Sequence, residues 1–299
     1  MPDLQSLVDA FRSDIDEDVA SFFSDAEAVR WINRGKGYIW AKAVEADEDF
    51  GLTSFDFSIV ADTANYVLQN DVYRIRRIEQ IFPSDSSRVP IPWYPIDLNQ
   101  KGDYDASAGG GSEAPLRYFL EARQFRTVPV PNSAQAGTNN GRVWYIPKLG
   151  DLQSGTATAG GASTITFPTT NTLPGALTSR IDDYYNGLDI LITSGTGVGQ
   201  VRRITDYDGS TRVATVDVPW TTLPTSASLY SLMTPIPDEY QYLQSQYAVI
   251  RGYLKDEADE KRVSKDHAIL LNEFIQYVTA RQNQKPRYVN YETDERYIG

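Results

Sequence analysis

Residues 237–284 read PDEYQYLQSQYAVIRGYLKDEADEKRVSKDHAILLNEFIQYVTARQNQ, and this stretch decides the fold. Pro237 suits the first position of a helix, where its missing N–H removes no hydrogen bond. Two apolar stripes follow in steps of three and four residues, the spacing of one helical face. The short polar break at residues 256–259 predicts an antiparallel helical hairpin that needs partner helices. The stripes comprise Tyr240, Leu243, Tyr247, Ile250 and Leu254, then Val263, His267, Leu270, Phe274 and Tyr277.

The N-terminal residues supply those partner helices. An apolar stripe from Leu4 to Ile15 predicts a helix over residues 4–19. Ser24, with Glu27 three residues later, forms a capping box that opens a second helix. Two glycines at positions 35 and 37 lie inside that helix, although each costs about 1 kcal/mol relative to Ala. They predict either a backbone packed closely beside them or a local kink.

Between residues 53 and 149 the sequence pattern becomes typical of β-strands. We interpret this region as a β extension of the helical part. Within it, residues 73–79 read YRIRRIE and carry three arginines in four positions. Such a run could bind phosphate, but more often it is an edge strand that charge protects from aggregation. A glycine-rich stretch, residues 106–112, lacks the Lys and Ser/Thr of a phosphate-binding loop and reads as a linker.

Residues 150–233 are poor in charge and rich in Thr, Gly and Ser, which predicts a small inserted β-sandwich or barrel. Expected strands are residues 163–167, 188–193, 200–206, 212–218 and 228–233. The turn at residues 207–210 should place Gly209 at positive φ. Residues 195–199 resemble a dinucleotide loop, but Gln200 replaces its third glycine, so a strand-to-strand turn is expected. Deleting this module should leave the helices folded.

The sequence therefore predicts an α+β fold. N-terminal and C-terminal helices form a bundle with a β extension, over residues 1–149 and 234–299. Residues 150–233 form the inserted β domain, and residues 285–299 form an extended C-terminal arm.

The amino-acid composition and the net charge exclude or disfavour several classes of function. The chain has no cysteine, which excludes disulfides and thiolate chemistry. We find no signal peptide and no apolar run of membrane-spanning length, so we expect a soluble protein made in a cytoplasm. The net charge is −12, and residues 1–60 hold thirteen acids against five bases. That balance disfavours wrapping of nucleic acid through its phosphates.

The residues that could belong to catalytic, cofactor-binding or metal-binding motifs lack the neighbouring residues that those motifs require. The single histidine, His267, lies on a helical stripe and is expected to be a packed residue rather than a base. Acids at positions 14, 16 and 18 have the spacing of a calcium loop, but Val19 and Asp25 replace its required Gly and Glu. A carboxylate pair among Asp182, Asp183 and Asp189 is the remaining route to sugar hydrolysis, and acid pairs arise by chance in a chain with 40 acids. We expect no enzyme, cofactor or metal.

Several short motifs resemble those of tailed-bacteriophage head-to-tail adaptor (connector) proteins in their order and spacing. They are FSD at residues 23–25 leading to WINR at 31–34, NYVL at 65–68, YRIRRIE at 73–79, WYIP at 144–147 and PDEY at 237–240. The resemblance covers about residues 1–149 and 234–299. Residues 184–220 resemble a β module of phage virion proteins, through YYNG at 184–187, SGTGVGQ at 194–200 and VPW at 218–220.

The resemblance implies a helical bundle with a β extension, assembled as a homo-oligomeric, twelve-fold ring beneath the portal protein. The DNA channel of the portal would continue through this ring, and genomic DNA would pass through it without specific binding. A tail or nozzle protein would attach below the ring. The protein would then be located in the virion, at the head–tail interface. Simple adaptors lack the inserted module, and its low charge and short-loop β texture predict that it lies outside the ring and contacts a neighbouring subunit, a tail protein or a fibre protein.

The C-terminal arm is rich in aromatic residues, which favours docking on a partner. The resemblance assigns it to the portal, whereas a terminal segment without a partner is the alternative. The residues assigned to portal binding are Lys285, Pro286, Arg287, Tyr288, Val289, Tyr291, Tyr297 and Ile298.

A different class of protein remains open. In a carbohydrate-binding or tail-fibre protein, the β module would be the working part. Such proteins present exposed aromatic platforms, and Tyr184, Tyr185 and Trp220 are the candidates for these partner contacts.

Overall fold

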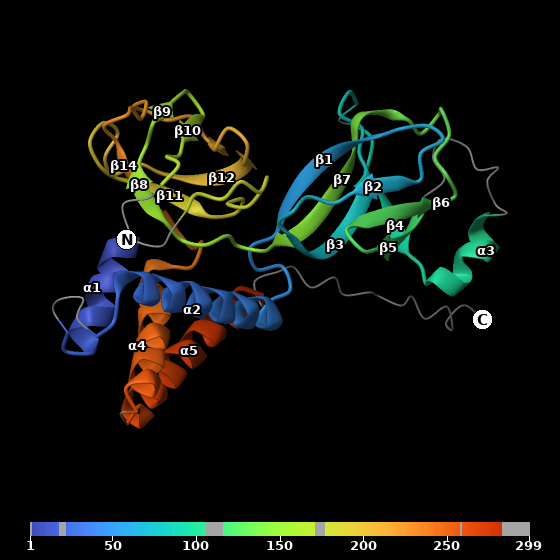
Figure 1. Cartoon of the computed structure of the whole chain (residues 1–299). Helices are drawn as coiled ribbons and strands as arrows, with labels where there is room; N and C mark the ends of the chain where they lie inside the picture. Colours follow the sequence, from blue (N-terminus) through green and yellow to red (C-terminus); the bar gives the residue numbers. More distant parts are fainter. Residues whose placement is uncertain are drawn as a thin grey trace, which may run out of the picture.

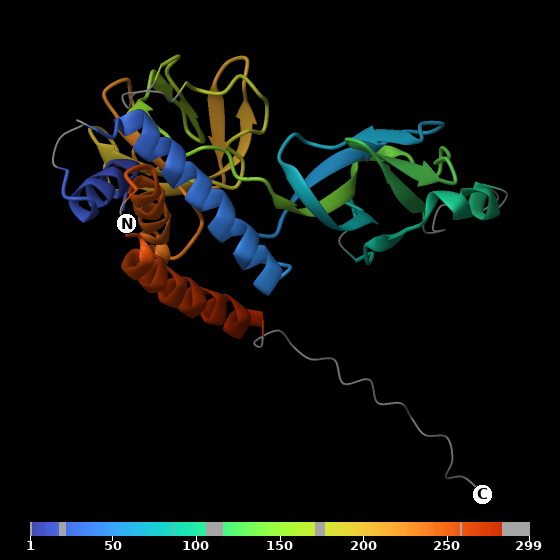
Figure 2. The same cartoon turned by 60° about the horizontal axis from the view of Figure 1, so that its bottom comes forward.

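The computed structural model describes residues 2–17, 22–85, 87–105, 116–170, 177–257 and 259–282. These residues make a mixed α+β fold with two seven-stranded sheets and a group of helices. Figure 1 shows the two sheets side by side, with the long helices gathered on the side of the second sheet and one short helix beside the first sheet, and Figure 2 shows the same grouping from another direction.

The main helices come from both ends of the chain and contact one another. The long helix α2 contacts α1, α4 and α5, while α4 also contacts α1 and α5. The polar break at residues 256–259 does separate two helices, as the sequence predicts. The first of them begins later than predicted, because Pro237 leads into a short 3-10 turn. The bounds are α1 Leu4–Asp14, α2 Asp25–Ala46, η2 Asp238–Tyr240, α4 Leu243–Lys255 and α5 Lys261–Gln282.

Helix α2 begins as the sequence predicts. The Ser24 side chain accepts a hydrogen bond from the Glu27 N–H, and the Glu27 side chain accepts one from the Ser24 N–H. Gly35 lies against α4, because a Cβ there would come within 2.9 Å of the Tyr247 Cβ. A Cβ at Gly37 would meet nothing within 4 Å, so the prediction of close packing is confirmed at Gly35 only.

The first sheet has the strand order β1-β7-β3-β4-β5-β6-β2, and its paired strands are antiparallel except β4 and β5. It has a hydrophobic core of its own, centred on Ile59, Ile78, Trp93 and Phe125. The bounds are β1 Thr53–Ile59, β2 Asn65–Val67, β3 Val72–Gln80, β4 Ile91–Pro95, β5 Arg117–Glu121, β6 Gln124–Val128 and β7 Gly137–Pro147, with η1 Leu98–Gln100 and α3 Lys101–Asp105 between β4 and β5.

The arginine-rich run is not an edge strand. It forms β3, which lies between β7 and β4 in the middle of the sheet. Charge is tolerated there because each arginine has a carboxylate of this chain within ion-pair distance. The pairs are Arg74 with Glu48, Arg76 with Glu48 and Asp49, and Arg77 with Glu79.

The second sheet has the order β8-β14-β11-β12-β13-β10-β9. The five strands expected from the sequence correspond to β10–β14, whereas β8 and β9 are too short to show an alternation. Its interior is aromatic: the Phe167 ring stacks on Tyr230 with centroids 4.6 Å apart. The bounds are β8 Ser154–Thr156, β9 Ala159–Gly160, β10 Thr164–Thr166, β11 Asp189–Ser194, β12 Val201–Asp208, β13 Val213–Val216 and β14 Leu229–Met233.

One turn of this sheet differs from its prediction. Between β12 and β13 the positive φ belongs to Arg212 (58°), not to Gly209. Gly209 is needed for space, since a Cβ there would lie 2.3 Å from the carbonyl carbon of Arg180. The glycines at 195, 197 and 199 all have positive φ and link β11 to β12, which confirms the strand-to-strand turn.

The second sheet shares one continuous hydrophobic core with the helices. Leu4, Phe11 and Ile32 of the helices belong to the same buried cluster as Ile190 and Tyr230 of the sheet. The backbone N–H of Leu4 also donates to the Ser231 hydroxyl, at 3.0 Å. The division into domains at residues 149 and 234 stays a prediction. In the described residues, no helix has both the length and the apolar character that crossing a membrane requires.

Candidate functional site

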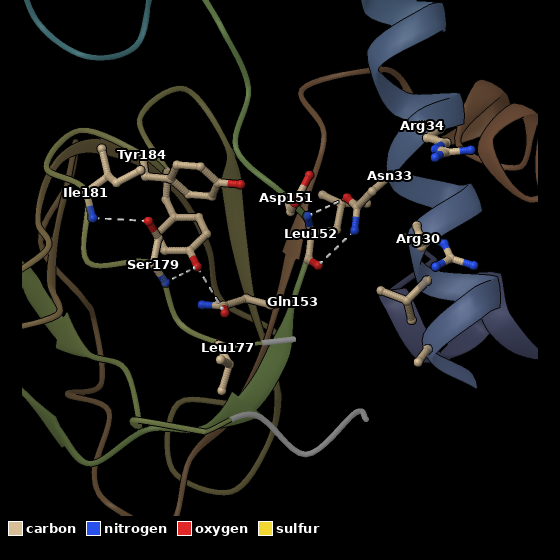
Figure 3. A pocket seen from close by; sticks show the side chains of 13 residues that line it. Arg30, Asn33, Arg34, Asp151, Leu152, Gln153, Leu177, Ser179, Ile181 and Tyr184 are labelled. Carbon is tan, nitrogen blue, oxygen red and sulfur yellow. Dashed lines mark hydrogen bonds between the residues drawn. The ribbon is translucent and has the colours of Figure 1, made fainter. Parts of the chain in front are cut away.

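A pocket of about 620 Å³ lies between α2 and the second sheet. Figure 3 shows Arg30, Asn33 and Arg34 on the α2 side, and Ile181 and Tyr184 on the opposite side. Residues 151–153, from the segment that joins the two sheets, lie between these walls. The pocket therefore forms where the helices, the second sheet and the joining segment meet.

One face of α2 holds that joining segment. The Leu152 N–H donates to Asn33 Oδ1 at 2.7 Å, and Asn33 Nδ2 donates back to the Leu152 carbonyl at 3.4 Å. One and two turns further along the helix, Lys36 donates to the carbonyls of residues 149 and 150, and Trp40 Nε1 donates to the Pro147 carbonyl at 3.0 Å. We call Asn33, Lys36 and Trp40 the α2 clamp. It satisfies backbone groups that no strand pairing satisfies and fixes the helix against the segment.

Lys36 is an unusual member of this clamp because its side chain is only 3% exposed. Burial lowers its pKa to about 8, and the Asp151 carboxylate, 3.3 Å away, partly opposes that shift. The ammonium group thus remains mostly protonated at neutral pH, where it can donate to two carbonyls and a carboxylate.

The rim of the pocket combines cations with exposed aliphatic groups. No carboxylate of the described residues lies within ion-pair distance of Arg34, whereas Arg30 lies 3.4 Å from Glu27. Across the pocket, Leu177 is 76% exposed and Ile181 is 53% exposed. The lining of the pocket thus combines the guanidinium groups of Arg30 and Arg34 with the Asp151 carboxylate and exposed aliphatic side chains.

A second polar cluster lies where the two sheets meet. The Asn70 N–H donates to Asp183 Oδ2 at 3.3 Å, and Asn70 Nδ2 donates to the Asp182 carbonyl at 3.1 Å. Beside them, the Tyr145 hydroxyl donates to Asp71 Oδ2 at 2.7 Å. Burial raises the pKa of Asp71 to about 7, and it also raises the pKa of Asp183. These contacts join the loop before β3 to the turn before β11.

The eight residues assigned to portal binding, from Lys285 to Ile298, lie outside the described residues. Of the candidate platform residues, Tyr185 is 2% exposed and Trp220 is 5% exposed, so neither presents a ring face to solvent. Tyr185 packs edge-on against Tyr207, inside the sheet, and the Trp220 Nε1 donates to the Thr164 carbonyl. Tyr184 is half-buried and lines the pocket. Contacts of these three residues with a partner stay a prediction.

The carboxylates considered for sugar chemistry make contacts within the fold. Asp189 pairs with Arg203 of the adjacent strand at 2.9 Å, and Asp182 accepts the Gly209 N–H at 2.8 Å. His267 is buried against the Tyr247 ring, and burial lowers its pKa. The prediction that His267 is a packed residue is confirmed.

Sequence reasoning missed Lys36 and Asp71, and it quoted Asn33 without giving it a role. The spacing of residues 33, 36 and 40 places three long polar or aromatic side chains on one helical face, and that pattern could have indicated a clamp. No comparable signal exists for Asp71, because its partners lie far away in the sequence.

Comparison with known proteins agrees with the resemblance noted in the sequence. No curated protein matches the chain. The family described as SU10 adaptor protein matches residues 2–291, which is nearly the whole chain and includes both sheets and the helices. The chain therefore belongs to the SU10 adaptor protein family, a family of phage adaptor proteins, and is a structural protein of the phage virion.

Proposed function

We propose that this protein is a head-to-tail adaptor that assembles as a twelve-fold ring between the portal protein and the tail or nozzle and continues the DNA channel. The family match over residues 2–291 is the observation that carries the proposal. The match runs through the second sheet, so this part belongs to the adaptor itself.

Contacts that hold the parts of the subunit together support this role. In the proposed adaptor, α1, α2, α4 and α5 serve as the helical bundle and the first sheet as its β extension. The α2 clamp fixes the segment between the sheets, which gives a subunit that can transmit position from one partner to the next. A connector needs that property more than it needs a reactive site.

Electrostatics supports passage of DNA without binding. The net charge is −12, and the arginines of β3 are paired with acids of the same chain. A channel lined by such a protein would repel phosphates and let DNA slide. We propose no enzymatic activity for the chain.

In this proposal residues 285–299 dock on the portal, while the second sheet contacts a neighbouring subunit, a tail protein or a fibre protein. We place that second contact at the pocket between α2 and the second sheet, because Arg34, Leu177 and Ile181 are exposed there. The carbohydrate-binding alternative loses support, because Tyr185 and Trp220 are buried within the sheet.

Electron microscopy of the protein with portal tests the proposal. An adaptor should give rings or portal-bound density, whereas rods or trimers would favour a fibre protein. Truncation after Gln284 should keep the circular dichroism of the full chain and abolish co-sedimentation with portal. As a matched control, replacing Tyr288, Tyr291 and Tyr297 by Ser keeps the length of the arm. Normal portal binding by the truncated chain would show that the arm is not the anchor.

A further inference from the structure

Three loops of the second sheet carry no charged residue. They lie within longer stretches without Asp, Glu, Lys, Arg or His, in a chain that is 23% charged, so each stretch would hold several charges at the average frequency. The stretches are residues 152–179, 190–201 and 218–237. We call the three loops the uncharged cap, which comprises β9 with the turn after it (159–163), the β11–β12 loop (195–200) and the β13–β14 loop (218–228).

The loops of the uncharged cap are held together by hydrogen bonds. Gln200 Nε2 donates to the Thr222 carbonyl at 2.9 Å, and Gln200 Oε1 accepts the Thr221 N–H at 2.8 Å. The Trp220 N–H donates to the Ala162 carbonyl at 2.8 Å. The glutamine that replaces the third glycine of a dinucleotide loop therefore fastens two loops to each other. Loops fixed in this way lose little conformational freedom when they bind a partner.

The uncharged cap also exposes aliphatic side chains. Val198 is 62% exposed, Val218 is 53% exposed and Leu223 is 50% exposed. Charged groups stand at the border of the cap beside Val218, since Arg202 Nε donates to its carbonyl at 3.0 Å and Asp217 Oδ1 accepts its N–H at 2.8 Å. An uncharged centre bordered by charged groups is the arrangement of core and rim in a protein interface.

We propose that the uncharged cap packs against a neighbouring subunit of the ring, which is a second copy of this chain; the inference rests on the proposed adaptor ring. Each copy has a net charge of −12, so two copies repel each other least where they meet at a surface without charge. A basic partner would instead be attracted to an acidic surface. A stable interface uses about 20–30 residues a side, and the cap supplies roughly that number.

This contact is separate from the pocket beside α2. The described residues that line the pocket include no residue of the uncharged cap. Figure 1 shows β9 and β10 on the side of the second sheet away from the helices. The pocket is therefore left open for a tail or fibre protein when neighbouring subunits meet at the cap.

Filling of portal rings by the full chain tests this surface, with the number of bound subunits counted by electron microscopy. The wild type should fill the portal cooperatively. Val198→Asp and Leu223→Asp should still bind portal as single subunits, but should add to a partly filled ring at least about tenfold more weakly, because a charge now lies between like-charged copies. Val67→Asp is the matched control, at a valine of β2 that is 77% exposed, and should fill the ring like the wild type.

Self-association of the chain alone, measured by sedimentation velocity, is an independent test of the same contact. Raising the salt concentration from about 0.05 to 0.5 M should strengthen association of the wild type, because salt screens the repulsion between copies, whereas ion pairs would weaken. Both Asp variants should associate more weakly at either salt concentration. Unchanged circular dichroism of the variants shows that the fold is kept.

The outcomes separate the two proposals. If both Asp variants fill the portal and associate like the wild type, the uncharged cap is not the subunit contact, and the adaptor role stands. If the wild type does not bind portal, the adaptor role is wrong, and self-association alone then decides whether the cap binds a second copy. A wild type that stays monomeric in both experiments overturns the cap contact.

Discussion

The side-chain amide of Asn33 bonds both the N–H and the carbonyl of Leu152, so a helix side chain pairs with a distant backbone as a neighbouring strand would. The second sheet begins only two residues later, at Ser154. Asn33 therefore sets the position of that sheet relative to α2. The rest of the α2 clamp repeats the same task towards Pro147, where the first sheet ends.

Asn33→Ala should destabilise the protein by about 1–3 kcal/mol, because the two backbone groups of Leu152 lose their partner. Urea unfolding monitored by circular dichroism measures this loss. Arg34→Ala, at the exposed neighbouring residue, is the matched control and should change stability by less than about 0.5 kcal/mol. Equal effects of the two substitutions would show that the amide pairing contributes little.

Lys36 should give the protein a characteristic pH dependence above neutrality. Its pKa is about 8 in the folded chain and has the ordinary value of 10.5 when exposed. Between these values the unfolded chain binds more protons, so the free energy of unfolding should rise as pH rises from about 8 to 10.5. Lys36→Met should flatten that rise, although it also lowers stability at pH 7 by leaving carbonyls without a donor.

The control for this experiment is Lys42→Met, at a partly exposed lysine of the same helix that pairs with Glu45. The Glu45 hydrogen bond raises the pKa of Lys42, so this lysine stays protonated in both states well below its ordinary value, and the variant should keep the wild-type slope between about pH 8 and 9.5. A wild-type slope in Lys36→Met would mean that another group titrates in this range.

Two glycines of α2 should respond to alanine with opposite signs. At Gly35 the added Cβ meets the Tyr247 Cβ at 2.9 Å and the Gln244 carbonyl oxygen at 3.1 Å. Overpacking of this kind costs about 1–3 kcal/mol, so Gly35→Ala should destabilise the protein. At Gly37 the Cβ meets nothing, and the better helix propensity of Ala should stabilise by up to about 1 kcal/mol. Chemical unfolding of both variants decides, and a stabilised Gly35→Ala would contradict the close approach of α4.

Local signals in the sequence predicted local structure well. Ser24 and Glu27 mark the start of α2 because a capping box needs only residues three positions apart. Long-range features could not be predicted in this way. Gly35 and Gly37 look alike in the sequence, and only the position of α4 distinguishes them.

The same limit applies to the β module. Tyr185 and Trp220 fit an exposed platform by residue type, yet burial depends on which strands close over them. Asp71 had no signal at all, because its partners Tyr145, Asp183 and Asn186 lie more than seventy residues away in the sequence. The arginines of β3 suggested an edge strand, since the pattern could not reveal the acids that pair with them across the fold.

The shared core leads to a prediction about which sheet the helices need. Low charge and β texture suggest that residues 150–233 are dispensable for the helices, whereas the structure places Ile190 and Tyr230 in one cluster with Leu4 and Phe11. The first sheet has its own core. The helices should therefore survive loss of the first sheet better than loss of the second.

Two deletion variants, one without each sheet, test this prediction. In each, the two residues to be joined lie close together in the fold. Thr53 and Tyr145 face each other on paired strands, so a short glycine linker can join them and remove residues 54–144. Leu232 N–H donates to the Gln153 carbonyl, so the same linker can join these residues and remove 154–231. The first variant should keep its helical circular dichroism and unfold cooperatively, because the cluster around Phe11 remains closed. The second should lose cooperative unfolding, since α1 loses its contact with β14 and apolar residues of the helices become exposed. If the second variant unfolds cooperatively and the first does not, the β module is an independent insertion after all.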